Sequence, residues 1–158
     1  MSDKLREVLV EPAVPGEHKL LLAISKESRY TRDFSHIMFS GPAAYEKEWV
    51  LVARRWRGVP LGFCCLRHCK NKPHTSLYYV AVREGFRGQG VGEKLLAEAL
   101  RRSPHGRLNL RCHKENAAAL AFYRRLRFTF IREDGDYHIL EKEVSRHDHK
   151  HSGDERQR

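Results

Sequence analysis

The chain has 158 residues, 41% of them hydrophobic, which fits a single domain with a hydrophobic core of its own. No apolar run approaches the roughly 20 residues of a membrane span. The opening "MSDKLREV" contains no apolar signal segment, so we expect a cytoplasmic protein without membrane association. The net charge of +10 favours an anionic partner but does not select a fold.

The first third of the chain predicts one strand followed by helices. Residues 6–12, "REVLVEP", are typical of a short strand that ends at a proline. Between residues 16 and 39, apolar residues recur at helical spacing in two segments. Gly41 and Pro42 then interrupt the helical pattern.

A hairpin and a further strand follow. Residues 48–55 and 61–68 are largely apolar and flank the turn "WRGVP", which indicates a β-hairpin. Residues 76–82, "SLYYVAV", predict the next strand of the same sheet. Because side chains alternate along a strand, the adjacent Cys64 and Cys65 should face opposite sides.

The second half of the chain alternates helices and strands. A helix is predicted from Val91 to just before Pro104, and residues 107–112 predict a strand. Residues 116–126 predict a helix that Asn116 caps, and the last two strands form a hairpin. This order of elements indicates a mixed sheet with helices packed over it, in a domain of residues 1–144.

Residues 145–158 are rich in charge and histidine and contain no large hydrophobic residue, which predicts a disordered tail. Its "HDHKH" segment offers metal ligands, but a solvated terminus is the favoured interpretation. The cysteines are expected to be reduced thiols, since paired zinc ligands at regular spacing are missing. These cysteines are Cys64, Cys65, Cys69 and Cys112. Structural roles are therefore favoured over a metal or redox site, and no metal is expected.

Three glycines, at 88, 90 and 92, lie between a predicted strand and a predicted helix. The first amide groups of a helix have no backbone partner, and the helix dipole makes them an anion site. The glycine spacing matches neither the dinucleotide-binding fingerprint nor the P-loop pattern. Arg87 adds donors that suit a phosphate. The alternative is a turn whose glycines only permit tight packing of strand and helix.

The segment Arg87-Gly88-Gln89-Gly90-Val91-Gly92 matches the R/Q-x-x-G-x-G/A signature for acyl-CoA pyrophosphate. The stretch "LYYVAVREGFRGQGVGEKLL" resembles motif A of the GNAT family of N-acetyltransferases, and "LRCHKENAAALAFYRRLRF" resembles its motif B. The resemblance implies an α/β GNAT fold. Its mixed, mostly antiparallel sheet would splay between the fourth and fifth strands, with helices on both sides.

The resemblance also implies acetyl-CoA as co-substrate. Backbone groups of two strand residues would pair with pantetheine, the glycine turn would hold the pyrophosphate, and an asparagine would contact the pantetheine arm. The residues carried over in this way are Ala81, Val82, Arg87, Gly88, Gln89, Gly90, Val91, Gly92, Glu93 and Asn116. Tyr123 would protonate the departing thiolate as general acid. The alternative for Tyr123 is an aromatic residue in the helix's core stripe.

Two positions depart from the family pattern. Glu84 stands where the family often has proline, and Arg127 stands where it usually has glycine before the final phenylalanine. An arginine at a helix end that needs positive φ would be mildly strained and would reshape that end. No general base is assigned; the residues considered are Asp33, His36, Glu84, His113 and Glu115.

The resulting hypothesis is an N-acetyltransferase that moves acetyl from acetyl-CoA to a primary amine by direct attack in a ternary complex. A small-molecule or peptide amine is the favoured acceptor. The alternatives are an RNA-directed acetyltransferase, for example on aminoacyl-tRNA, and a CoA-binding regulator without turnover. Nucleic acid as a partner thus stays open, and the protein is expected to be a monomer or a homodimer.

Overall fold

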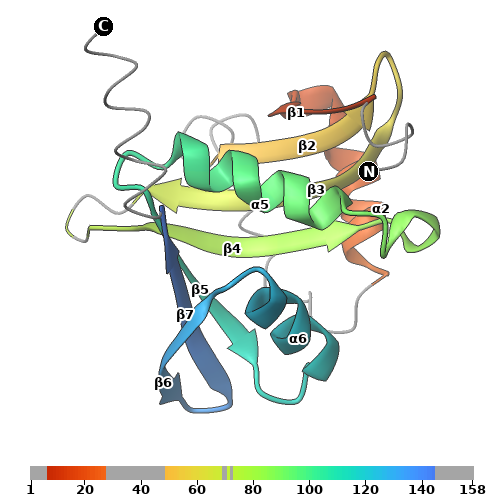
Figure 1. Cartoon of the computed structure of the whole chain (residues 1–158). Helices are drawn as coiled ribbons and strands as arrows, with labels where there is room; N and C mark the ends of the chain where they lie inside the picture. Colours follow the sequence, from red (N-terminus) through yellow and green to blue (C-terminus); the bar gives the residue numbers. More distant parts are fainter. Residues whose placement is uncertain (1–6, 28–48, 69–70, 72, 145–158) are drawn as a thin grey trace, which may run out of the picture.

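The computed structural model describes residues 7–27, 49–68, 71 and 73–144 (Figure 1). Within these residues the chain forms one seven-stranded sheet in the order β1-β2-β3-β4-β5-β7-β6. The strands are β1 (Val8–Pro12), β2 (Trp49–Arg55), β3 (Pro60–His68), β4 (Thr75–Val82), β5 (Arg107–His113), β6 (Thr129–Asp134) and β7 (Tyr137–Glu143). The helices are η1 (Pro15–Glu17), α2 (His18–Ser25), η2 (Glu84–Phe86), α5 (Val91–Arg102) and α6 (Ala117–Arg125).

The two halves of the sheet meet at its parallel pair, β4 and β5. Their pairing covers three positions, from Thr75–Leu108 to Leu77–Leu110, and every other neighbouring pair of strands is antiparallel. Beyond Leu77 the strands diverge, as Figure 1 shows where β5 and β7 run steeply away from β4. The predicted fold class, with its splay between the fourth and fifth strands, is confirmed.

A β-bulge in β4 explains where the divergence begins. Cys65 of β3 pairs with Tyr79, whereas the next residue, Leu66, pairs with Leu77. Tyr78 is therefore an extra residue on β4. A bulge bends its strand and increases the local twist. The bulge lies directly after the last β4–β5 pair, at the position where the two strands diverge.

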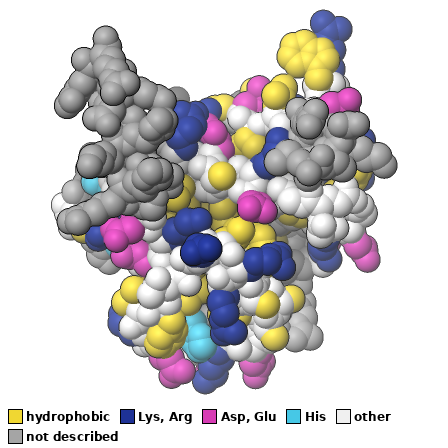
Figure 2. All heavy atoms as spheres, viewed as in Figure 1, with side chains coloured by type: hydrophobic (Ala, Val, Ile, Leu, Met, Phe, Trp, Pro, Cys, Tyr) yellow, Lys and Arg dark blue, Asp and Glu magenta, His cyan; other side chains and the backbone are white. Residues whose placement is uncertain are grey.

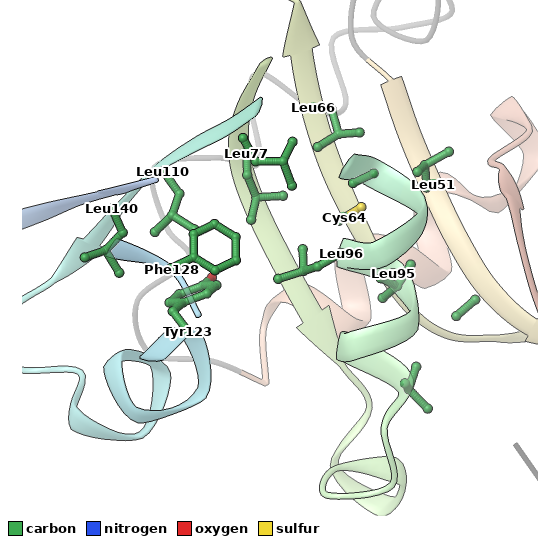
Figure 3. Close-up of a cluster of buried hydrophobic side chains, with 14 of the residues drawn as sticks. Leu51, Cys64, Leu66, Leu77, Leu95, Leu96, Leu110, Tyr123, Phe128 and Leu140 are labelled. Atoms are coloured by element: carbon green, nitrogen blue, oxygen red, sulfur yellow. The ribbon is translucent and has the colours of Figure 1, made fainter. Parts of the chain in front are cut away.

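Each face of the sheet carries its own hydrophobic core. On one face, α5 inserts Leu95 and Leu96 into a cluster with Cys64 of β3 (Figure 3). On the other face, α2 packs Leu21 and Ile24 against Phe63 and Cys65. The adjacent cysteines thus face opposite sides, as the alternation of the strand predicts.

The predicted elements between residues 48 and 144 are all present, with boundaries shifted by one or two residues. The first predicted strand and the first helical segment correspond to β1 and to η1 with α2. The second helical segment, Cys69 and the tail of residues 145–158 lie outside the described residues. None of the helices in the described part of the chain is long and apolar enough to span a membrane.

Candidate active site

A cleft of about 1510 Å³ lies where β4 and β5 diverge. Its walls come from the second half of β4, the glycine turn, the first turn of α5, the end of β5 and one side of α6. The two hydrophobic cores hold these elements in place. A cleft of this size between two diverging strands can hold a long ligand.

The glycine turn adopts a backbone that requires glycine at two positions. Gly88 has a φ of 75° and Gly90, which immediately precedes α5, has a φ of 87°. Residues that carry a side chain rarely adopt this left-handed backbone conformation. A Cβ at Gly88 would meet no atom within 4 Å, so the backbone at this position is open to a ligand.

The third glycine has a different role. A Cβ on Gly92 would lie 3.1 Å from Cζ of Phe122 in α6. Gly92 is buried and helical, so it serves the close approach of α5 and α6. Tight packing therefore explains Gly92, whereas the open backbone at Gly88 leaves room for the predicted anion site.

Arg87 connects the glycine turn to its surroundings. Its Nε donates a hydrogen bond to the Val82 carbonyl over 3.1 Å, and its Nη2 lies 3.6 Å from Oε2 of Glu27, just after α2. The same carboxylate accepts a hydrogen bond from the Glu84 amide over 2.8 Å. The Arg87 side chain is half exposed in the cleft wall, where its charge adds to the positive end of the α5 dipole.

Asn116 begins α6 as predicted. Its Oδ1 accepts a hydrogen bond from the Ala119 amide over 3.2 Å, which satisfies one of the first amide groups of the helix. Asn116 and Ala119 both line the cleft. The cap therefore fixes the start of α6 beside the expected path of the co-substrate.

Tyr123 lies in the hydrophobic core and also lines the cleft. The residue is 8% exposed, and its ring lies 5.3 Å from the Phe122 ring and 5.4 Å from the Phe128 ring. In Figure 3 its hydroxyl points away from α6 and toward β4. Burial raises the pKa of the Tyr123 hydroxyl well above its usual value, and nearby Cys112 raises it further. The hydroxyl is therefore protonated at neutral pH.

The end of α6 positions Tyr123 through a Schellman motif. Arg127 has a φ of 69°, its amide donates to the Arg124 carbonyl, and the Phe128 amide donates to the Tyr123 carbonyl. The Tyr123–Phe128 ring contact is the hydrophobic contact that accompanies this motif. Arg127 thus adopts the conformation that glycine favours, and the helix end keeps its standard geometry instead of being reshaped.

Nearly all residues assigned to acetyl-CoA by the resemblance line the cleft. Gln89 does not: it is exposed, and its Nε2 donates to the Gly85 carbonyl over 3.4 Å. Among the residues considered as general base, His113 and Glu115 line the cleft and Glu84 does not. His113 Nδ1 accepts a hydrogen bond from the Glu115 amide over 3.1 Å. Asp33 and His36 lie outside the described residues.

The cleft also contains residues that the sequence patterns did not single out. They include Tyr78, Tyr79, Arg111 and Tyr137. The alternation of polar and apolar residues in β5 could have indicated Arg111. This residue follows Leu110, which belongs to the hydrophobic cluster, so Arg111 belongs to the opposite face of the sheet. The remaining ones depend on contacts between distant segments.

Comparisons with known proteins agree with this geometry. The model of the acetyltransferase (GNAT) family matches residues 18–128. The chain is 42% identical to the 5-NmdU N-acetyltransferase of Pseudomonas phage PaMx11 over 127 residues, which cover 80% of this chain and 90% of the phage protein.

Solved structures of similar fold support the same assignment. The PaiA N-acetyltransferase from Thermoplasma acidophilum in complex with coenzyme A has a TM-score of 0.72 at 18% identity, covering 91% of this chain and 100% of that one. The ribosomal-protein-S18-alanine N-acetyltransferase from Escherichia coli has a TM-score of 0.67 at 17% identity, with coverages of 87% and 94%. The chain therefore belongs to the GNAT family of acetyltransferases, enzymes that use acetyl-CoA as the acetyl donor.

Proposed function

We propose that the protein transfers the acetyl group of acetyl-CoA to a primary amine carried by a pyrimidine nucleoside or nucleotide. The observation that carries the acceptor class is the 42% identity to a 5-NmdU N-acetyltransferase, an enzyme for a deoxyuridine derivative. The net charge of +10 suits both anionic coenzyme A and an acceptor that bears phosphate.

The residues of the cleft suit each part of acetyl-CoA. Gly88 leaves the backbone of the turn open, and the first amide groups of α5 point toward this turn, which favours the pyrophosphate. The backbone of Ala81 and Val82 lies beyond the last β4–β5 pair, so it supports hydrogen bonding to pantetheine. Asn116, at the start of α6, supports contact with the pantetheine arm.

The chemistry is a direct transfer. The neutral amine nitrogen attacks the acetyl carbonyl carbon, the new C–N bond forms, and the C–S bond of the thioester breaks. The nitrogen loses a proton to solvent or to a basic group of the cleft. The departing thiolate takes a proton from the Tyr123 hydroxyl, which solvent then reprotonates. Support for this role comes from the position of Tyr123 in the wall of the cleft.

The acceptor class can be tested with purified protein and acetyl-CoA. The acceptors are 5-NmdU as nucleoside, a plain aliphatic amine and a peptide with a free amino terminus. Release of free thiol gives the rate, and mass spectrometry identifies the acetylated product. We expect kcat/KM for 5-NmdU to exceed that for the other two amines by at least about tenfold. Preference for the peptide or the aliphatic amine would contradict the proposal.

A further inference from the structure

The end of β5 presents a set of polar and aromatic side chains on the face of the sheet away from α5 and α6. Leu108, Leu110 and Cys112 of β5 belong to the cluster beneath α5. Because side chains alternate along a strand, Arg111 and His113 belong to the opposite face. Tyr137 of β7 pairs with His113 and lines the cleft together with both residues.

Arg111 and Tyr137 form a stack within this set. The Arg111 guanidinium carbon lies 4.8 Å from the centroid of the Tyr137 ring. One edge of the guanidinium is held by Asp134 of β6, with Nη1 3.2 Å from Oδ2. The His113 ring contacts Tyr137 edge-on, with 5.4 Å between the centroids. Three strands thus fix the position of one guanidinium group.

The Arg111 side chain is nevertheless 55% exposed. Tyr137 supports the guanidinium from the ring side, so the exposure lies on its remaining surface toward the cleft and solvent. A guanidinium is planar, is weakly hydrated and carries several donors in its plane. Nucleic-acid bases stack on guanidinium planes as they do on aromatic rings.

The ion pair of Arg111 with Asp134 favours an uncharged planar ligand over a phosphate. Asp134 places a negative charge 3.2 Å from the guanidinium, which lowers the attraction of the pair for a phosphate. Because Asp134 contacts the guanidinium through Nη1, this ion pair does not cover the flat face of the group. The stack therefore suits a flat, uncharged ring with carbonyl acceptors better than it suits a phosphate group.

We infer that Arg111, supported by Tyr137 and Asp134, is a specificity-determining residue that binds the pyrimidine ring of the acceptor by stacking. This inference rests on the proposed function and names the residue that recognises its substrate. Arg111 lines the same cleft as residues 77–82 of β4, so a ring stacked on it would lie within the cleft between the two strands. The stack shares no residue with the glycine turn that is proposed to hold the pyrophosphate of acetyl-CoA.

The test compares Arg111→Lys with wild type and with the matched control Arg132→Lys. Lysine keeps the charge and removes the planar group, and Arg132 lies exposed on β6 outside the cleft. We expect Arg111→Lys to raise KM for 5-NmdU about tenfold, the effect of losing one stacking contact. The KM for acetyl-CoA and kcat should change by less than about twofold. Arg132→Lys should match wild type.

A second measurement keeps this inference separate from the proposed function. Thymidine has no acceptor amine, so its binding, followed by nuclear magnetic resonance, does not depend on turnover. Thymidine binding that Arg111→Lys weakens would uphold the inference even if 5-NmdU were not acetylated. The inference is overturned if wild type does not bind thymidine, or if Arg111→Lys leaves thymidine binding and the KM for 5-NmdU unchanged.

Discussion

The hydroxyl of Tyr123 lies in an environment that disfavours its ionised form. Its ring packs between Phe122 and Phe128, and burial raises its pKa well above the usual value. The ring therefore belongs to the packed core, and the hydroxyl is the proposed proton donor. A substitution that separates these two contributions tests the catalytic one directly.

Tyr123→Phe keeps the ring and removes the proton donor. We expect kcat to fall by about tenfold to a thousandfold, the range for loss of a general acid. The dissociation constant of acetyl-CoA should stay the same, because the ring still fills its place in the core. Steady-state kinetics and calorimetric titration measure the two quantities. Unchanged kcat would leave Tyr123 with a packing role alone.

Cys64 makes stability depend on pH on the alkaline side. Burial raises the pKa of its thiol from 9.0 to about 12 and that of Cys112 to about 11. Below pH 9 the two thiols are protonated in both the folded and the unfolded chain, so their burial contributes its full stabilisation. As pH rises above 9, only the unfolded chain ionises, so stability falls until the folded pKa values are reached.

The expected slope for Cys64 is at most about 1.4 kcal/mol of unfolding free energy per pH unit. Urea unfolding between pH 8 and about 11 measures this slope for wild type and for Cys64→Ala. The variant should be less stable at pH 8 because of its cavity, yet lose stability more slowly as pH rises. Parallel curves for the two proteins would show that the thiol does not titrate as described.

At the scale of elements, the glycine turn and α5 form one unit. Gly88 and Gly90 supply the left-handed turn, and Gly92 lets α5 lie against α6. The turn is thus both the proposed pyrophosphate site and the start of a helix in the core. The effect of a substitution in this turn must therefore be compared with the effect of the same substitution at another glycine of positive φ.

Gly90→Glu should abolish stabilisation by acetyl-CoA. Ligand at 100 times its dissociation constant stabilises by about 2.7 kcal/mol, which raises the melting temperature of wild type by roughly 5–10 °C. In the variant, the carboxylate repels the pyrophosphate. Gly135→Glu is the control, because Gly135 also has positive φ but lies in the β6–β7 turn outside the cleft. A full temperature shift in folded Gly90→Glu would place the pyrophosphate elsewhere.

The end of α6 offers a stabilising substitution. Arg127 occupies a left-handed position at a φ of 69°, which costs a residue with a side chain about 1 kcal/mol. Arg127→Gly should therefore raise the unfolding free energy by about 0.5–1 kcal/mol in urea titration. Arg124→Gly, within the helix, should lower it by about 1 kcal/mol. Destabilisation by Arg127→Gly would mean that its side chain makes compensating contacts.

For the whole molecule, the distribution of charge decides how an acceptor approaches. Figure 2 shows Lys and Arg side chains near the centre of the face that carries α5 and α6. Arg125 lines the cleft, and Arg124 is exposed beside it on the same helix. A polynucleotide that carries the acceptor would contact such residues through its phosphates, whereas a nucleoside would not.

The salt dependence of the reaction measures these phosphate contacts. With acetyl-CoA saturating, we expect kcat/KM for nucleoside 5-NmdU to change little between about 50 and 200 mM salt. For 5-NmdU within an oligonucleotide it should fall steeply, by about 10³ or more if six or more phosphates are neutralised. Arg124→Glu combined with Arg125→Glu should flatten that dependence. Equal salt dependence of kcat/KM for the two acceptors would mean that the basic surface residues do not contact the phosphates of the oligonucleotide.

Local patterns predicted the parts of this protein that depend on neighbouring residues. Strand alternation placed Cys64 and Cys65 on opposite faces, and the side chain of Asn116 caps α6 as its position indicated. The strand–turn–helix with its glycines, together with motif B, was sufficient to identify the family, the fold class and the acetyl donor. Each of these features depends on residues within one or two turns of one another.

Tertiary structure alone decided the features that join distant segments. The bulge at Tyr78 depends on its register with β3, and the role of Gly92 depends on Phe122, thirty positions further along the chain. Arg111 stacks on Tyr137 only because β5 pairs with β7. The sequence by itself therefore determined the elements, the family and the acetyl donor. Only packing between elements decided the shape of the cleft and the set of residues that line it, because such contacts have no local pattern.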